Sequence, residues 1–161
     1  MSRRHLLQAL DGSLDRLGID HVDLWQLHGW DPSTPLDETL ATLDFAVSSG
    51  RARYVGLSNY SGWQTAKAAG WQGSWPGRTP LASTQVEYSL LERGVEREVV
   101  PAALDAGLSV LAWSPLGRGV LTGKYRTGIP ADSRAASDHL AGFVEPYLDD
   151  AHSRIVHAVC T

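Results

Sequence analysis

The sequence predicts an α/β fold in which one helix is followed by four repeats of a strand and a helix. Three observations predict this class. Apolar residues recur at helical spacing in some segments, short β-branched and aromatic runs lie between them, and glycine or proline marks the boundaries. Alternation at this spacing implies a parallel sheet with right-handed crossovers. Because no repeat and no linker is visible, we expect one structural unit, residues 1–161, with a sheet too small to close into a barrel.

The first third of the chain is predicted to hold two helices around a strand. Ser2 can cap a helix that Gly18 terminates. Its leucine stripe consists of Leu6, Leu7, Leu10, Leu14 and Leu17. Residues 22–28, VDLWQLH, form an apolar-rich strand. A second helix opens at Pro35 and closes at Gly50.

The remaining strands and helices follow in alternation. Further strands are expected at residues 53–57, 82–86 and 108–113. Helices are expected at residues 62–69 after a Ser61 cap, at residues 95–106 with a bend at Pro101, and from Pro146 onward. Residues 127–142 are polar and irregular, a composition typical of a lid.

Composition and charge exclude several classes of protein. A net charge of -4 gives no support to a nucleic-acid or membrane surface, so we expect neither partner. Cys160 is the one cysteine, which excludes an intrachain disulfide and a thiolate metal cluster and fits a reducing cytoplasm. We predict no metal site, and the sequence leaves the oligomeric state open.

Polar or aromatic residues lie at the C-terminal end of each predicted strand. These are His28, Ser58 and Asn59, Gln85, and Trp113 with Ser114. Each has an ordinary structural interpretation, such as a hydrogen-bonded histidine or a helix-entry turn after a strand. Parallel α/β proteins bind ligands at this edge, however, and packing alone does not explain four polar ends at the same topological position.

The stretch from Leu108 to Lys124, LSVLAWSPLGRGVLTGK, runs from a strand into a glycine-rich, basic loop. Glycines allow a backbone to approach a ligand, and free amide hydrogens in such a loop suit an anion. Arg118 and Lys124 would add positive charge. The pattern favours a phosphate-binding loop, and an ordinary strand and turn is the alternative.

Several segments in this order and spacing resemble the aldo-keto reductases. The resemblance is closest to the branch that contains bacterial broad-range aldehyde and ketone reductases and the β-subunits of voltage-gated potassium channels. The matching segments are DHVDLWQLHGWD, PLDETLATLDFAVSSGRARYVGLSNYSGWQ, TQVEYSLLER and AWSPLGRGVLTGKY followed by GIPADSR. The resemblance implies a partial (β/α)8 TIM barrel, about four parallel strands corresponding to strands four to seven, that binds NADPH and reduces the carbonyl group of a small molecule.

The resemblance also assigns roles to the strand ends. His28 matches the active-site histidine that polarises the substrate carbonyl. Ser58, Asn59 and Gln85 match the residues that hold the nicotinamide carboxamide, and Trp113 matches the aromatic ring on which the nicotinamide stacks.

The resemblance places the cofactor pyrophosphate at the glycine-rich loop. The matching loop residues are Ser114, Pro115, Leu116, Gly117, Arg118 and Gly119. Lys124 and Arg134 match its cationic contacts. Trp30 either lines the carbonyl pocket or anchors its own loop.

The sequence departs from the family pattern in its catalytic acid. The family uses a tyrosine supported by a lysine and an aspartate, all on the first three strands. Tyr54, Tyr60, Tyr88 and Tyr125 fall in segments that match other parts of the pattern. We therefore expect an interior fragment of a reductase that is inactive and poorly folded alone. The alternatives are a nucleotide-sensing regulatory subunit of the channel β type and a non-functional gene fragment.

Overall fold

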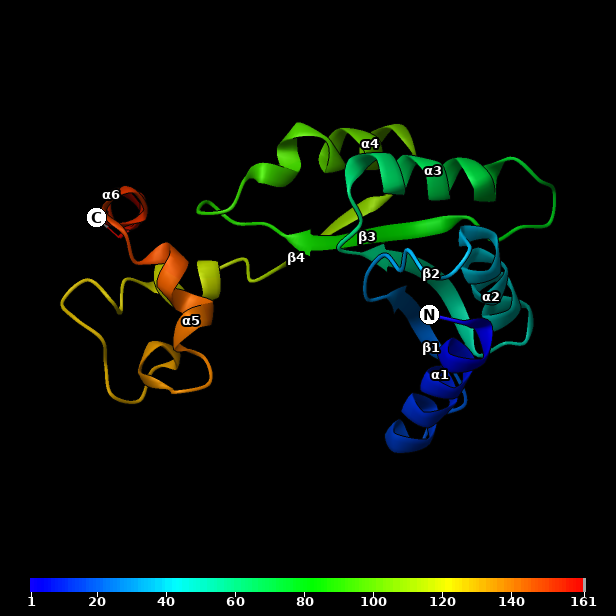
Figure 1. Ribbon diagram of the computed structural model, residues 1–161, viewed down its shortest axis with the longest axis horizontal. Coiled ribbons are helices and arrows are strands. Elements are labelled where there is room, and N and C mark those ends of the chain that lie inside the picture. The colour runs from blue at the N-terminus through cyan, green and yellow to red at the C-terminus, as the bar shows by residue number, and fades with distance from the viewer. Residues whose placement is uncertain (161) are drawn as a thin grey trace. The chain divides into compact units, whose positions relative to one another are not determined.

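A computed structural model describes residues 1–160 and confirms the α/β class (Figure 1). One sheet holds four parallel strands in the order β1-β2-β3-β4. They span Val22–Leu27, Ala52–Ser58, Leu81–Glu87 and Ser109–Trp113. Two compact units emerge from the chain. The first comprises residues 1–86 and 96–111, and the second comprises residues 87–95 and the segment from Ala112 onward.

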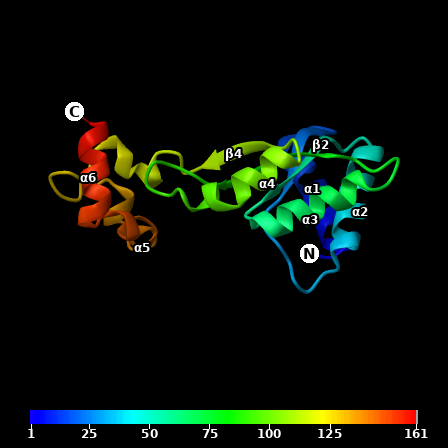
Figure 2. The same cartoon turned by 90° about the horizontal axis from the view of Figure 1, so that it is seen from above.

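Four α-helices belong to the first unit. They are α1 (Arg3–Leu17), α2 (Leu36–Ser48), α3 (Gly62–Gly73) and α4 (Val99–Asp105). Ser2 caps α1 as predicted, by accepting a hydrogen bond from the amide of His5, and Gly18 ends it at φ 68°. Ser61 caps α3 in a reciprocal capping box with Gln64. Helices α3 and α4 lie side by side (Figures 1 and 2).

The helix expected at residues 95–106 is shorter and breaks elsewhere. A 3₁₀ turn spans Gly94–Arg97, and α4 begins at Val99 after the non-helical Glu98. Pro101 does not bend the helix, because it lies in the first turn of α4. Amide groups in the first turn have no hydrogen-bond acceptor within the helix, so the lack of an N–H at proline costs nothing there.

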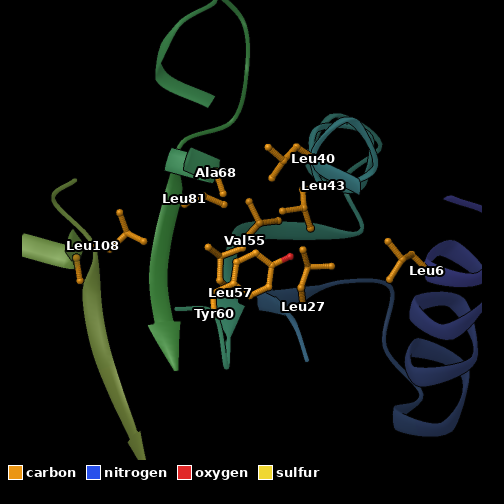
Figure 3. Packing of buried hydrophobic residues seen from close by; sticks show 11 residues of the cluster. Leu6, Leu27, Leu40, Leu43, Val55, Leu57, Tyr60, Ala68, Leu81 and Leu108 are labelled. Atoms are coloured by element: carbon orange, nitrogen blue, oxygen red, sulfur yellow. The ribbon is translucent and has the colours of Figure 1, made fainter. Parts of the chain in front are cut away.

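The core of the first unit lies between the helices and one face of the sheet. Leu40 and Leu43 project from α2 toward Val55 of β2, and Leu6 approaches from α1 (Figure 3). Val55, Leu40 and Leu43 are fully buried. Burial of such side chains stabilises the fold by about 1.5–3 kcal/mol each, which holds the sheet rigid enough to position polar groups at its edge.

The opposite face of the sheet carries the polar residues. In the register of β1 with β2, Gln26 pairs with Gly56, and in that of β2 with β3, Gly56 pairs with Ser83. The register shifts just before this row, because Val55 pairs with Leu81. Ala82 is therefore an extra residue on β3, a β-bulge.

The second unit contains short helices joined by irregular segments. They are the 3₁₀ helix Gly117–Thr122, the 3₁₀ turn Arg134–Ala136, α5 (Ala141–Val144), the 3₁₀ turn Glu145–Tyr147 and α6 (Asp150–Val159). Leu91, Val120, Val144 and Val156 pack in its core. The last helix begins at Asp150 rather than near Pro146, because the Asp149 side chain accepts a hydrogen bond from the amide of His152 and so caps the helix there.

Among the residues described, no helix combines the length and the apolar character needed to cross a membrane.

Candidate functional site

The ends of the first three strands are joined by hydrogen bonds that involve predicted site residues. Asn59 donates from its side-chain amide to the carbonyl of His28 at 2.9 Å and from its backbone amide to the carbonyl of Gln85 at 2.9 Å. Ser58 donates its hydroxyl to the same Gln85 carbonyl at 2.9 Å. Asn59 adopts φ 56°, a left-handed conformation that asparagine tolerates better than most residues. The structure thus brings His28, Ser58, Asn59 and Gln85 to one edge of the sheet.

These four residues differ in their exposure. Ser58 is buried and Gln85 is partly buried, whereas His28 and Asn59 are exposed. His28 directly follows β1. It lies two residues after Gln26, so the two positions fall on the same face of the sheet. An exposed imidazole beside fixed amide groups can donate a hydrogen bond to one small molecule while the amides orient a second molecule.

Gln26 is a residue of this edge that the sequence argument overlooked. Its Oε1 accepts a hydrogen bond from Nε2 of Gln85 at 3.1 Å. Its own Nε2 donates to Ser83 Oγ at 3.2 Å and to the Leu57 carbonyl at 3.1 Å. A signal was available, because Gln26 interrupts an apolar strand two positions before His28 and therefore shares its side of the sheet.

Trp30 lies in an aromatic cluster beside this edge. Its ring meets that of Tyr60 at 5.3 Å between centroids and that of Trp63 at 5.4 Å, both edge to face. Trp30 packs against the main core, so the structure shows the loop-anchor contact that the sequence left as one of two alternatives. Burial raises the pKa of Tyr60 from 10.0 to about 12, so its hydroxyl resists ionisation even above pH 10.0.

The predicted pyrophosphate loop lines a cavity of about 430 Å³ in the second unit. The lining residues are Ser114, Pro115, Leu116, Arg118, Gly119, Lys124 and Arg134. The structure therefore brings Lys124 and Arg134 to the loop to which the sequence assigned them. A Cβ atom on Gly119 would lie 3.4 Å from Nζ of Lys124, so the ammonium group rests against the backbone of the loop.

Backbone geometry explains why this loop is rich in glycine. Gly117, Arg118 and Gly119 all adopt positive φ angles, of 55°, 57° and 96°. A Cβ atom on Gly117 would lie 2.6 Å from Leu91. The amides of Gly117 and Gly119 donate within the loop, to the carbonyls of Ser114 and Leu116. The positive charges of Lys124 and Arg134, rather than these two amides, are therefore what the cavity offers an anion.

The side chain of Arg118 is bound within the second unit. Its guanidinium pairs with both oxygens of Glu87 at 2.7 Å and donates to the Phe143 carbonyl at 2.6 Å. It also stacks on the Phe143 ring at 3.9 Å and on the Tyr147 ring at 4.9 Å. The bond to Glu87 is the main cause that raises the pKa of Arg118. The charge that the sequence assigned to phosphate is thus largely compensated by Glu87.

Trp113 ends β4 at the start of the same loop. It is partly buried, and its carbonyl accepts the Tyr88 amide at 3.3 Å. The Arg118 guanidinium lies 6.0 Å from the centre of its ring. Ser114 follows with φ 51°, which turns the chain away from the strand.

Comparison with known proteins decides the family. The sequence matches the model of the aldo/keto reductase family over residues 1–156. The chain belongs to the aldo/keto reductase family.

Several curated aldo/keto reductase relatives are similar to this chain. L-glyceraldehyde 3-phosphate reductase of Escherichia coli K12 is 42% identical over 134 residues, which cover 83% of this chain and 38% of that protein. Versiconal hemiacetal acetate reductase of Aspergillus parasiticus is 40% identical over 123 residues, covering 75% of this chain and 35% of that protein. A protein named probable voltage-gated potassium channel subunit beta, from Oryza sativa, is 39% identical and covers 99% of this chain and 49% of that protein. The chain thus spans less than half the length of each of these relatives.

Aldo/keto reductases generally use a nicotinamide cofactor, and the donor set of this chain fits one. A carboxamide needs both a donor and an acceptor, and the side-chain amides of Asn59 and Gln85, anchored to the His28 carbonyl and to Gln26, each carry both. A pyrophosphate needs cations, and Lys124 and Arg134 line one cavity. The residues present therefore suit the two polar parts of such a cofactor.

Proposed function

We propose that this chain carries the cofactor-holding part and the active-site histidine of an enzyme that reduces aldehydes or ketones to alcohols with NADPH. The observation that carries this proposal is the hydrogen-bonded junction of His28, Asn59 and Gln85 at the carboxyl edge of the sheet. It combines an exposed imidazole for a carbonyl oxygen with amide groups that suit a carboxamide. Membership of the aldo/keto reductase family and the reductase names of two relatives support the same reaction class.

In the proposed reaction each residue has a separate task. His28 donates a hydrogen bond to the substrate carbonyl oxygen, which makes the carbonyl carbon more electrophilic. Gln85 and Asn59 hold the carboxamide and so fix which ring face is presented to the substrate. When bound, NADPH would supply the hydride to the carbonyl carbon and become NADP⁺, and the oxygen would take its proton from a general acid, which the family provides as a tyrosine. Lys124 and Arg134 hold the pyrophosphate by charge.

The catalytic role of His28 is tested by His28→Ala in the protein as expressed from its gene. We expect kcat/KM for small aldehydes, glyceraldehyde 3-phosphate among them, to fall by about 100-fold while NADPH still binds. His21→Ala is the matched control, because His21 stands at the other end of β1, roughly 20 Å away along the strand. Equal activity of the two variants would refute the role of His28.

The cationic cavity is tested through the lysines, of which the sequence contains only Lys67 and Lys124. Lys124→Ala should raise the Kd for NADPH about tenfold, because a charge-assisted hydrogen bond is lost. Lys67→Ala, on the exposed surface of α3, should leave the Kd unchanged. Fluorescence titration of NADPH measures the Kd of both variants. The same titration with NADH tests the preference for the cofactor that carries the 2′-phosphate.

A regulatory subunit of the channel β type is the second candidate. The similarity to the Oryza sativa protein over 99% of this chain favours it. Both candidates bind NADPH, so the distinguishing measurement is carbonyl-dependent oxidation of bound NADPH in a single turnover. Rapid oxidation supports the reductase, and binding without oxidation supports the regulatory subunit.

We also infer that residues 1–161 expressed by themselves do not turn over. The tyrosines in the matching segments correspond to other parts of the family pattern, so none of them supplies the family's general acid, and the loss of such an acid typically costs a factor of about 100 to 10,000. Carbonyl-dependent NADPH oxidation by this polypeptide alone would contradict the inference.

A further inference from the structure

The side chain of Gln26 reaches from β1 across β2 to β3, because Gly56 on β2 has no side chain. Gln26, Gly56 and Ser83 occupy one row of the sheet. A Cβ atom on Gly56 would lie 3.3 Å from Cγ of Gln26 and 2.4 Å from Oγ of Ser83. The gap left by glycine is the space through which the Gln26 amide passes to reach β3.

The hydrogen bonds of Gln26 determine which way its amide points. The Leu57 carbonyl can only accept, so the group that lies 3.1 Å from it must be the NH₂ of Gln26. The Oε1 atom of Gln26 is then directed at the Gln85 amide. An oxygen there needs a donor, so Gln85 presents its own NH₂, at 3.1 Å.

The hydrogen bond to Gln26 identifies Nε2 of Gln85 and therefore also its Oε1. With Nε2 bound to Gln26, Oε1 of Gln85 is the atom left to accept a hydrogen bond from a ligand. The two ends of a glutamine amide have nearly the same shape, so packing alone does not select between them. The backbone carbonyl of Leu57 makes the selection through Gln26.

We propose that Gln26 is a positioning residue that fixes the Gln85 amide so that Oε1 of Gln85 accepts from the NH₂ of the nicotinamide carboxamide. The proposal rests on the proposed function, since it takes the ligand to be a nicotinamide cofactor. If the side-chain amide of Gln85 were rotated by half a turn, its NH₂ would face the NH₂ of the carboxamide, and two donors would meet without an acceptor. Gln26 therefore acts on cofactor recognition without touching the cofactor.

A purely structural role for Gln26 predicts something different. In that case its three hydrogen bonds only satisfy buried polar groups, and their loss weakens the binding of every nucleotide to the same extent. Two cofactors that differ only in the carboxamide separate these roles. NADP⁺ and its 3-acetylpyridine analogue share all phosphates and both sugars, and the analogue has an acetyl group with no N–H to donate.

The experiment measures the Kd of both nucleotides in the protein as expressed from its gene. The unmodified protein should bind NADP⁺ more tightly than the analogue by about 5- to 10-fold, the effect of one hydrogen bond. Gln26→Met keeps the length of the side chain and removes its polar atoms, so the ratio should fall toward one.

The outcomes are distinct. If neither nucleotide binds the unmodified protein, the proposed function fails. If both bind and the ratio in Gln26→Met equals that of the unmodified protein, the role of Gln26 is refuted. Should Gln26→Met not fold, Gln26→Asn takes its place with the same expectation, because its amide is one methylene too short to reach Gln85.

Discussion

Gly56→Ala should destabilise the protein, because the row formed by Gln26, Gly56 and Ser83 has no room for a methyl group. The new Cβ atom would lie 2.4 Å from Ser83 Oγ and 2.8 Å from the Ser83 carbonyl oxygen. The hydroxyl can rotate away, but the carbonyl belongs to β3, so β2 and β3 must separate by several tenths of an ångström. Forcing an extra methyl into packed structure costs about 1–3 kcal/mol.

The loss should extend to the polar row. Rotation of the Ser83 hydroxyl breaks its 3.2 Å hydrogen bond with Gln26, which adds about 1 kcal/mol. We therefore expect the free energy of unfolding to fall by about 2–4 kcal/mol. Urea denaturation followed by circular dichroism measures this change as a lower midpoint.

Gly70→Ala provides the matched control. Gly70 lies inside α3, and a Cβ atom there would meet nothing within 4 Å. Alanine favours a helix over glycine by about 1 kcal/mol, so this variant should be more stable than the unmodified protein. If Gly56→Ala unfolds at the same urea concentration as the unmodified protein while Gly70→Ala is stabilised, the packing argument for the polar row is wrong.

Three further predictions concern charged and titrating groups. Glu87→Gln should lower the free energy of unfolding by about 2 kcal/mol in urea denaturation, because the largely buried Arg118 loses its charged bidentate partner. Glu145→Gln, at an exposed position, should change the free energy of unfolding little, and equal values for the two variants would contradict the prediction. The His152 amide lowers the pKa of Asp149 below its usual 3.8, so the cap stabilises α6 above pH 3.8 and is lost as the pH falls through the lowered pKa. Asp149→Asn keeps the cap and should flatten this acid dependence of Tm, and parallel curves for the two proteins would count against the assignment. Burial raises the pKa of Tyr60 from 10.0 to about 12. Only the unfolded tyrosine ionises between these two pH values, so the contribution of Tyr60 to the free energy of unfolding is full below pH 10.0 and falls between pH 10.0 and about 12. Tyr60→Phe should lose less stability than the unmodified protein over that interval, which thermal melts at rising pH can measure.

Local patterns in the sequence were enough to predict most elements of the first unit. The Ser2 and Ser61 caps and the glycine at position 18 lie where the sequence placed them, because a cap is decided by two or three adjacent residues. The polar ends of the first three strands lie together, because parallel strands bring their carboxyl ends to one edge.

Features that depend on distant residues were not predicted. Arg118 is compensated by Glu87, which precedes it by 31 residues, and no local pattern indicates that pairing. The role of Gln26 depends on the empty position at Gly56, which becomes visible only when the register of β1 with β2 is known. The break before α4 lies at Glu98, whose non-helical backbone no cap explains, and the late start of α6 is set by the Asp149 cap, which propensity alone does not reveal.

The bulge at Ala82 has a consequence for how β3 tolerates changes in length. Leu81 and Gln85 are an even number of residues apart and would share a face in a regular strand. The extra residue instead lets Leu81 enter the core while Ser83 and Gln85 stand level with Gly56 and Ser58. A deletion of Ala82 would leave every other pair of the ladder in place. A deletion between Ser83 and Gln85 would remove the Gln85 amide from its row. Within one strand a deletion can therefore preserve the polar row or break it, depending on a shift of one residue.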